Sequence, residues 1–118
     1  MDKPRILFVC GKNQWRSPTA ERIYRNDPRI EVRSAGVSAG SNHQISADDL
    51  LWANLVMVME RRYKTRIQGD FREHPNLPRI VSLEISDDYP LMDDVLIKLL
   101  REGVEFHLQQ EFGIDPGP

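Results

Sequence analysis

Runs of consecutive apolar residues mark the segments that are predicted to be strands. The most pronounced are residues 6–9, which read Ile-Leu-Phe-Val, and residues 55–59, which read Leu-Val-Met-Val-Met. Uninterrupted apolar runs bounded by turn-forming residues are typical of strands that are buried on both faces of a sheet. Together with two further candidates, the pattern predicts strands at residues 4–10, 30–35, 55–59 and 78–83.

Between and after these strands, apolar residues recur at helical spacing. The segments predicted to be helices are 17–27, 46–51, 60–71 and 91–112. Ser17 is predicted to be the N-cap of the first helix, with Pro18 at the first helical position and Pro28 ending the element. Ser46, followed three residues later by Asp49, predicts the start of the second helix. The last helix has an apolar stripe formed by Met92, Leu96, Leu99 and Leu100.

The alternation of strand and helix, repeated four times, predicts the fold class. It is typical of an α/β protein in which helices cover both faces of a parallel sheet. We therefore predict a single three-layer α/β domain over residues 1–112, with a four-stranded parallel sheet, and a frayed C-terminal tail over residues 113–118. Ligands of such sheets bind beyond the carboxyl ends of the strands, so Cys10 should face the ligand crevice.

Composition and charge narrow the range of functions. The chain has 118 residues, of which 40% are hydrophobic and 29% charged, so a folded domain is expected rather than a disordered chain. Its net charge of −2 is unevenly distributed: residues 1–40 carry eight Lys or Arg against four Asp or Glu, whereas residues 84–118 carry two against nine. The basic first part can attract an anionic ligand. The chain as a whole is not basic, which disfavours a nucleic-acid partner.

Hydropathy and cysteine content add further expectations. No apolar run approaches the roughly 18 residues that a membrane span needs, and the N-terminus lacks the pattern of a secretory signal. The only cysteine, Cys10, cannot form an internal disulfide or a cysteine-rich zinc site. We therefore expect a cytoplasmic protein without a metal, a cofactor or a membrane partner.

One eight-residue window carries the candidate chemistry. It lies between the first strand and the first helix and reads Cys10-Gly11-Lys12-Asn13-Gln14-Trp15-Arg16-Ser17. A tight loop at a helix N-terminus can point successive backbone N–H groups inward and bind an anion. Arg16 offers a planar fork to two oxygens of a tetrahedral oxyanion. The same positive environment favours the thiolate of Cys10, which could then attack a bound phosphoryl group.

The rest of this window is predicted to shape the anion site. Gly11 helps the loop to turn tightly, and Asn13 can adopt a left-handed backbone conformation. Ser17 can cap the helix or hydrogen-bond the cysteine sulfur, and Lys12 adds positive charge near the mouth. The candidate substrate-binding residues of the loop are Gly11, Lys12, Asn13, Gln14, Trp15 and Ser17. Taken singly, the cysteine could be a buried structural thiol and the arginine a surface residue, but their occurrence in one window favours catalysis.

An acidic residue is expected in the same crevice, because the group that leaves phosphorus needs a proton. The best candidates are Asp87 and Asp88, which follow the last strand and precede the last helix. Two adjacent carboxylates near a bound dianion repel it and each other, which favours protonation of one of them. Tyr89 could form an aromatic wall beside the substrate. Alternatively, Asp88 caps a helix that Pro90 opens, and the local sequence does not choose between the two aspartates.

The Cys-x5-Arg-Ser-Pro window, followed by Thr19-Ala20-Glu21, resembles the low-molecular-weight protein tyrosine phosphatase family. The whole chain looks most like a compact bacterial branch of that family. Residues 33–36, which read Arg-Ser-Ala-Gly, and residues 56–60, which end in an acidic residue, are similar to further family segments. The resemblance implies that Cys10 is the nucleophile and Arg16 the phosphate-binding arginine. It also implies that Asp87 is the general acid, because residues 87–89 are similar to the family's Asp-Pro-aromatic loop.

Three features depart from the family pattern. Trp15 stands where many members have a second cysteine, so no disulfide can form within the loop. The segment between the second and third predicted strands is shorter than usual. Asp88 replaces the proline of the acid loop, which keeps Asp88 as an alternative acid.

The resemblance implies a phosphatase that needs no metal and no cofactor and hydrolyses aryl phosphate monoesters on a protein or a small molecule. In the first step Cys10 attacks phosphorus while Asp87 protonates the leaving phenol, and in the second water hydrolyses the cysteinyl-phosphate. Two alternatives stay open. A non-catalytic phosphate- or phosphoprotein-binding module would need the loop but no acid. An arsenate reductase would need an external thiol, because this chain has one cysteine.

Overall fold

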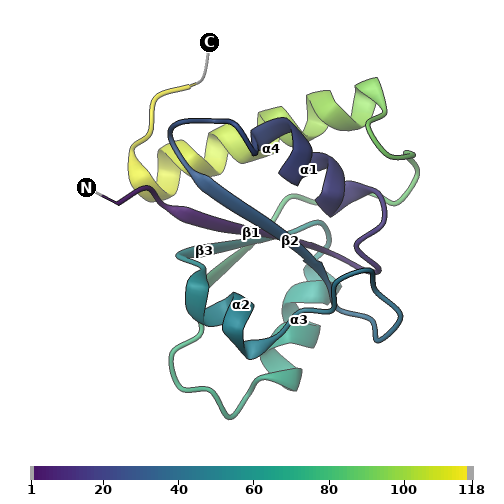
Figure 1. The fold of residues 1–118 in the computed structure, drawn as a ribbon, viewed down its shortest axis with the longest axis vertical. Coiled ribbons are helices and arrows are strands. Elements are labelled where there is room, and N and C mark those ends of the chain that lie inside the picture. The colour runs from purple at the N-terminus through teal and green to yellow at the C-terminus, as the bar shows by residue number, and fades with distance from the viewer. Residues whose placement is uncertain (1, 117–118) are drawn as a thin grey trace.

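Strands and helices alternate along the chain, as the sequence pattern predicts. The computed structural model describes residues 2–116. In chain order (Figure 1) its elements are β1 Arg5–Cys10, α1 Arg16–Tyr24, β2 Glu31–Gly36, α2 Ala47–Trp52, β3 Leu55–Val58, α3 Arg61–Asp70, β4 Arg79–Ser82 and α4 Asp94–Phe112. The predicted α/β class is confirmed, and most element boundaries differ from the prediction by one to three residues.

The four strands form one parallel sheet with the order β2-β1-β3-β4. At the end of β1, Cys10 is in register with Gly36 of β2, and Val9 is in register with Val58 of β3. Because all strands run in one direction, their carboxyl ends lie at the same edge of the sheet. The loops that follow the strands therefore meet at that edge.

Two helices cover each face of the sheet. Figure 1 shows α1 and α4 on one side and α2 and α3 on the other. Since both faces are covered, the side chains of β1 after Arg5 and all those of β3 are buried, which explains their apolar runs. The buried stripe of α4 consists of Leu96, Leu100, Val104 and Leu108. None of the helices within residues 2–116 is long and apolar enough to cross a membrane.

Helix α1 begins earlier than predicted. Its N-cap is Trp15, without a side-chain cap, and Ser17 lies inside the first turn. Pro18 also lies in this turn, where a missing N–H removes no intrahelical hydrogen bond. The hydroxyl of Ser17 is not available as a cap because it is engaged with the side chains of Cys10 and Asn13. In contrast, Ser46 caps α2 as predicted, through a reciprocal pair of hydrogen bonds with residue 49.

Helix α4 begins later than predicted. Its N-cap is Asp93, whose carboxylate accepts hydrogen bonds from Val95 N at 2.9 Å and Leu96 N at 3.1 Å. Neither Pro90 nor Asp88 therefore opens or caps this helix. Met92 precedes the helix with a φ of 61° and is exposed, so it does not belong to the buried stripe.

The residues just after α4 are held by specific contacts. Gly113 ends the helix in the left-handed conformation with a φ of 64°, which suits glycine, and its N–H bonds the carbonyl of Gln109. The backbone carbonyl of Asp115 accepts a hydrogen bond from Arg29 at 2.7 Å. The fraying that the sequence predicts for 113–118 stays a prediction, and residues 117–118 lie outside the described part of the chain.

Candidate active site

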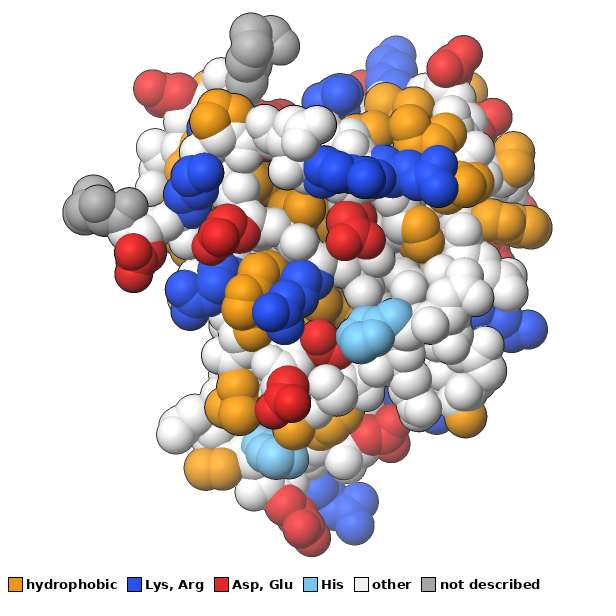
Figure 2. Space-filling view, viewed as in Figure 1, with side chains coloured by type: hydrophobic (Ala, Val, Ile, Leu, Met, Phe, Trp, Pro, Cys, Tyr) orange, Lys and Arg blue, Asp and Glu red, His pale blue; other side chains and the backbone are white. Residues whose placement is uncertain are grey.

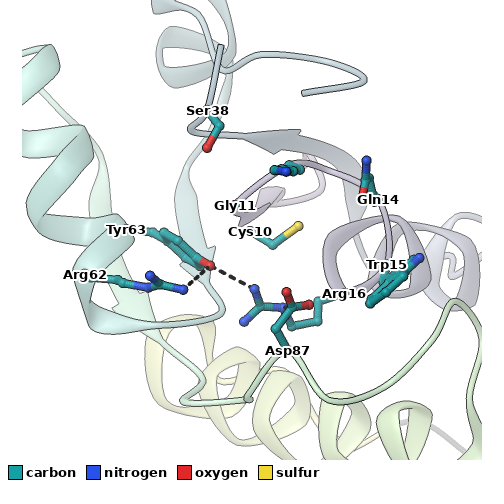
Figure 3. A pocket seen from close by; sticks show the side chains of 10 residues that line it. Cys10, Gly11, Gln14, Trp15, Arg16, Ser38, Arg62, Tyr63 and Asp87 are labelled. Carbon is teal, nitrogen blue, oxygen red and sulfur yellow. Dashed lines mark hydrogen bonds and ion pairs between the residues drawn. The ribbon is translucent and has the colours of Figure 1, made fainter. Parts of the chain in front are cut away.

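A pocket of about 330 Å³ lies where the loop after β1 meets the start of α1. Figure 3 shows the side chains around it, and the lining residues are Cys10, Gly11, Lys12, Gln14, Trp15, Arg16, Ser38, Arg62, Tyr63 and Asp87. The predicted window supplies the first six of these residues. The others come from segments that follow β2, β3 and β4, as expected for the carboxyl edge of a parallel sheet.

The sulfur of Cys10 lies beside the hydroxyl of Ser17. The two atoms are 2.9 Å apart, and the same hydroxyl accepts a hydrogen bond from Asn13 Nδ2 at 2.9 Å. The Ser17 hydroxyl also lies 3.3 Å from the carbonyl oxygen of Ala35. A hydroxyl has one proton, so it can donate to that carbonyl when the cysteine is a thiol and to the sulfur when it is a thiolate. This arrangement gives an ionised Cys10 a hydrogen-bond donor inside the protein.

The loop that follows β2 fixes the backbone of the loop that follows β1. Three consecutive carbonyls accept hydrogen bonds from it: Gly11 O from Ser38 N at 2.9 Å, Lys12 O from Asn42 N at 3.2 Å, and Asn13 O from Asn42 Nδ2 at 2.9 Å. Asn13 adopts the predicted left-handed conformation, with a φ of 55°. Within the described residues, no backbone N–H group of residues 11–15 donates to a protein acceptor. A turn whose carbonyls are bonded on the outside and whose N–H groups are unpaired is suited to binding an anion.

The guanidinium of Arg16 is buried and held from three directions. Its side chain is 2% exposed, and Nη1 donates to Glu60 Oε2 at 2.5 Å and to the carbonyl of Ile85 at 2.8 Å. Nη2 donates to the hydroxyl of Tyr63 at 2.8 Å. The buried Nε has no hydrogen-bond partner among the described residues and lies 3.4 Å from a carboxylate oxygen of Asp87. Nε–H and the second hydrogen of Nη2 are therefore the guanidinium donors that have no hydrogen-bond acceptor among the described residues.

Electrostatic coupling keeps this side of the pocket in one charge state. Burial opposes the charge of Arg16, but hydrogen bonds with Glu60 and Tyr63 outweigh it and raise the pKa of Arg16. Burial also opposes the charge of Glu60, but hydrogen bonds from Arg16 and neighbouring side chains lower the pKa of Glu60. Burial raises the pKa of Tyr63. At neutral pH the group consists of a cation, a carboxylate and a neutral phenol.

The two candidate acids occupy different places. Asp87 lines the pocket, with a side chain that is 59% exposed. Asp88 is exposed, accepts a hydrogen bond from Ser86 at 2.7 Å, and is not among the lining residues. The structure therefore brings only the first of the pair into the pocket.

Three of the predicted substrate-binding residues are not among the lining residues. Tyr89 packs against the hydrophobic core, so the aromatic rings of the pocket belong to Trp15 and Tyr63. Asn13 and Ser17 are buried behind the loop, where they hold its shape. Their amide and hydroxyl groups bond each other and the cysteine, which explains why they do not face the pocket.

Sequence reasoning did not single out three residues that line the pocket. Ser38 follows β2, whereas Arg62 and Tyr63 follow β3 at the start of α3. The signal that points to them is the convergence, at one edge of the sheet, of the segments that follow parallel strands. Within residues 2–116, no group of three or more His, Cys, Asp or Glu side chains is placed to hold a metal ion.

The fold and this pocket define a class of α/β protein with a cysteine- and arginine-lined pocket at a strand-to-helix loop. The family model described as low molecular weight phosphotyrosine protein phosphatase matches residues 5–66. Because this match spans more than half of the chain, the chain belongs to that family of phosphatases. The resemblance noted from the sequence is thereby confirmed.

Some of the individual relatives are named arginine phosphatases and others tyrosine phosphatases. A curated protein-arginine-phosphatase from Geobacillus stearothermophilus is 31% identical over 93 residues, which span 58% of this chain and 63% of that protein. The structure of the YwlE arginine phosphatase from Geobacillus stearothermophilus is 26% identical, with a TM-score of 0.66, and the match covers 92% of this chain and 94% of that one. The tyrosine phosphatase Wzb from Escherichia coli K30, in complex with phosphate, shares the fold at 21% identity, with a TM-score of 0.73 and coverage of 93% and 99%.

Gly36, the last residue of β2, tests the packing that shapes the loop. A Cβ atom there would lie 2.8 Å from Asn13 N and 2.3 Å from Ser41 Oγ, whereas nothing lies within 4 Å of the corresponding position at Gly40. We predict that Gly36→Ala lowers the free energy of unfolding by about 1–3 kcal/mol, a typical cost of overpacking. Gly40→Ala, the matched control, should leave it nearly unchanged. Urea unfolding measures both, and equal stability of the two variants would contradict the packing described here.

Proposed function

We propose that this protein is a cysteine-dependent phosphatase that hydrolyses phosphate monoesters through a cysteinyl-phosphate intermediate. The observation that carries the proposal is that Cys10 and Arg16 line the same pocket. Unpaired backbone N–H groups of residues 11–15 and the unpartnered Nε of Arg16 supply donors for a tetrahedral dianion. Membership of a phosphatase family supports the same reading.

In the first step a bond forms between sulfur and phosphorus. The Cys10 thiolate attacks the phosphoryl group while the bond from phosphorus to the leaving oxygen breaks. Asp87, at the edge of the pocket, gives its proton to that oxygen. The loop N–H groups and Arg16 stabilise the charge on the phosphoryl oxygens, so this step requires no metal ion.

In the second step water attacks the cysteinyl-phosphate. Asp87, now ionised, takes a proton from the water, and the sulfur–phosphorus bond breaks to release inorganic phosphate. The hydroxyl of Ser17, 2.9 Å from the sulfur, can donate a hydrogen bond to the departing thiolate. This contact makes the thiolate a better leaving group.

The substrate that fits this proposal best is a phosphotyrosine side chain or a small aryl phosphate. The aromatic rings of Trp15 and Tyr63 line the pocket and can contact a phenyl ring. Phosphoarginine is a second candidate, because two relatives are named arginine phosphatases. The same two steps apply to it, with a nitrogen in place of the leaving oxygen. The cytoplasmic location expected from the sequence stays a prediction.

The assignment of roles is tested with phenyl phosphate, whose poor leaving group needs an acid. We predict hydrolysis by the wild type in the presence of a chelator and complete loss of turnover in Cys10→Ser. Asp87→Asn should lower kcat by about 10²–10⁴-fold, the range typical of general acid catalysis, whereas the matched control Asp88→Asn should stay close to the wild type. The reverse result for the two aspartates would move the acid to Asp88. Tight phosphate binding without turnover would favour a binding module, and thiol-dependent reduction of arsenate would favour a reductase.

A second comparison separates the two substrate candidates. We predict that kcat/KM is higher for a phosphotyrosine peptide than for a phosphoarginine peptide of the same sequence, because the pocket offers two aromatic rings to the substrate side chain. Release of inorganic phosphate measures both reactions. A higher kcat/KM for the phosphoarginine peptide would assign the protein to that substrate instead.

A further inference from the structure

Exposed apolar side chains gather beside the pocket. Among the described residues, six large hydrophobic side chains are exposed, and four of them belong to the start of α1 and the start of α4: Trp15, Leu91, Met92 and Val95. We call these four residues the apolar rim. Figure 2 shows hydrophobic side chains concentrated at the upper right, over the beginning of α4 and the segment before it. Exposed apolar side chains that gather on one part of a surface can form an interaction site.

The apolar rim reaches the pocket through Trp15. Trp15 itself lines the pocket. The backbone N–H of Met92 donates to Thr19 Oγ1 at 3.0 Å, and this hydroxyl donates to the carbonyl of Trp15 at 2.6 Å. The hydrogen bonds therefore hold the segment before α4 against the N-terminal turn of α1.

The backbone at Met92 is held in an unfavourable conformation. Its φ of 61° lies in the left-handed region, which residues other than glycine, asparagine and aspartate seldom adopt. The next residue, Asp93, starts α4 by capping it. The Met92 side chain is 37% exposed. Backbone strain of this kind concentrates at functional sites.

The two sides of the pocket mouth differ in chemistry. In Figure 3, Trp15 and Arg62 lie on opposite sides of the Cys10 sulfur. Arg62 offers a charged side chain, whereas the Trp15 side continues into the apolar rim. A small phosphate ester reaches only the pocket. A polypeptide whose phosphorylated side chain enters the pocket has to cross the mouth.

We propose that the apolar rim binds a bulky apolar side chain of a polypeptide substrate, next to its phosphorylated residue. This inference rests on the proposed phosphatase function and adds the class of substrate: a protein segment with leucine, methionine or a similar residue beside the phosphorylated side chain. Burial of that side chain against the rim supplies the affinity, because apolar surface leaves water on both partners. The same contact would not affect a substrate without flanking residues.

The test compares two phosphotyrosine peptides that differ only at the residues on either side of the phosphotyrosine, leucine in one and serine in the other. For the wild type we expect a kcat/KM roughly tenfold higher with the leucine peptide, the factor that partial burial of one aliphatic side chain supplies. Fluorescence anisotropy with Cys10→Ser should give a similar ratio of affinities, in a readout that does not depend on turnover.

Variants then locate the contact. Met92→Asn combined with Val95→Ser should bring the ratio between the two peptides close to one while kcat/KM for phenyl phosphate stays unchanged. Asparagine tolerates the left-handed backbone, so this substitution avoids new strain. Phe106→Ser is the matched control, because Phe106 is an exposed apolar residue of α4 outside the rim, and it should keep the wild-type ratio.

The outcomes separate this inference from the proposed function. Equal kcat/KM for the two peptides in the wild type, together with hydrolysis of phenyl phosphate, would overturn the apolar rim and leave the phosphatase function standing. Preferential binding of the leucine peptide without any hydrolysis would support the rim and overturn the phosphatase. An equal loss of preference in Phe106→Ser would also overturn the assignment to the rim. The wild-type comparison keeps the proposal testable even if the double variant does not fold.

Discussion

The structure depends on how the loop after β1 satisfies its backbone hydrogen bonds. Buried or half-buried carbonyl and N–H groups need partners, and here the loop after β2 supplies partners to three consecutive carbonyls, at residues 11–13. The N–H groups of the same loop have none among the described residues. The left-handed conformation of Asn13 makes this one-sided arrangement possible within a short turn. A loop built in this way offers several N–H donors to an anion, in keeping with the proposed binding of a phosphoryl group.

The buried guanidinium of Arg16 follows the same logic. A buried charge is costly unless it is paired, and here Glu60 accepts a hydrogen bond from Nη1 and Tyr63 accepts one from Nη2. This pairing fixes the plane of the guanidinium before any ligand arrives, so little conformational entropy is lost on binding. The chain belongs to a family of phosphatases, and a guanidinium held in this way is suited to binding the phosphoryl group of a substrate. Arg16 is proposed to contact the phosphoryl group, and the apolar rim is proposed to contact the polypeptide that carries this group.

Local signals in the sequence account for the elements that were predicted well. The apolar runs of β1 and β3 and the Ser46 cap depend on neighbours in the chain, and all three agree with the structure. Contacts between distant segments account for the differences. Ser17 looks like a helix cap until it bonds Cys10, and Tyr63 looks like an ordinary core residue until it meets Arg16, 47 positions away. The sequence around Tyr89 does not show that its ring packs against the core and not in the pocket. The core residues that it contacts belong to other elements of the chain.

The central claim is that Cys10 carries the phosphoryl group during the reaction. The most direct measurement is rapid acid quenching of the wild-type protein during hydrolysis of a ³²P-labelled phosphotyrosine peptide, followed by mapping of the label. The account predicts a covalent phosphoryl group on Cys10 that appears before the steady state and disappears as inorganic phosphate is released. Turnover without any label on the protein, or a label on a residue other than Cys10, would contradict it.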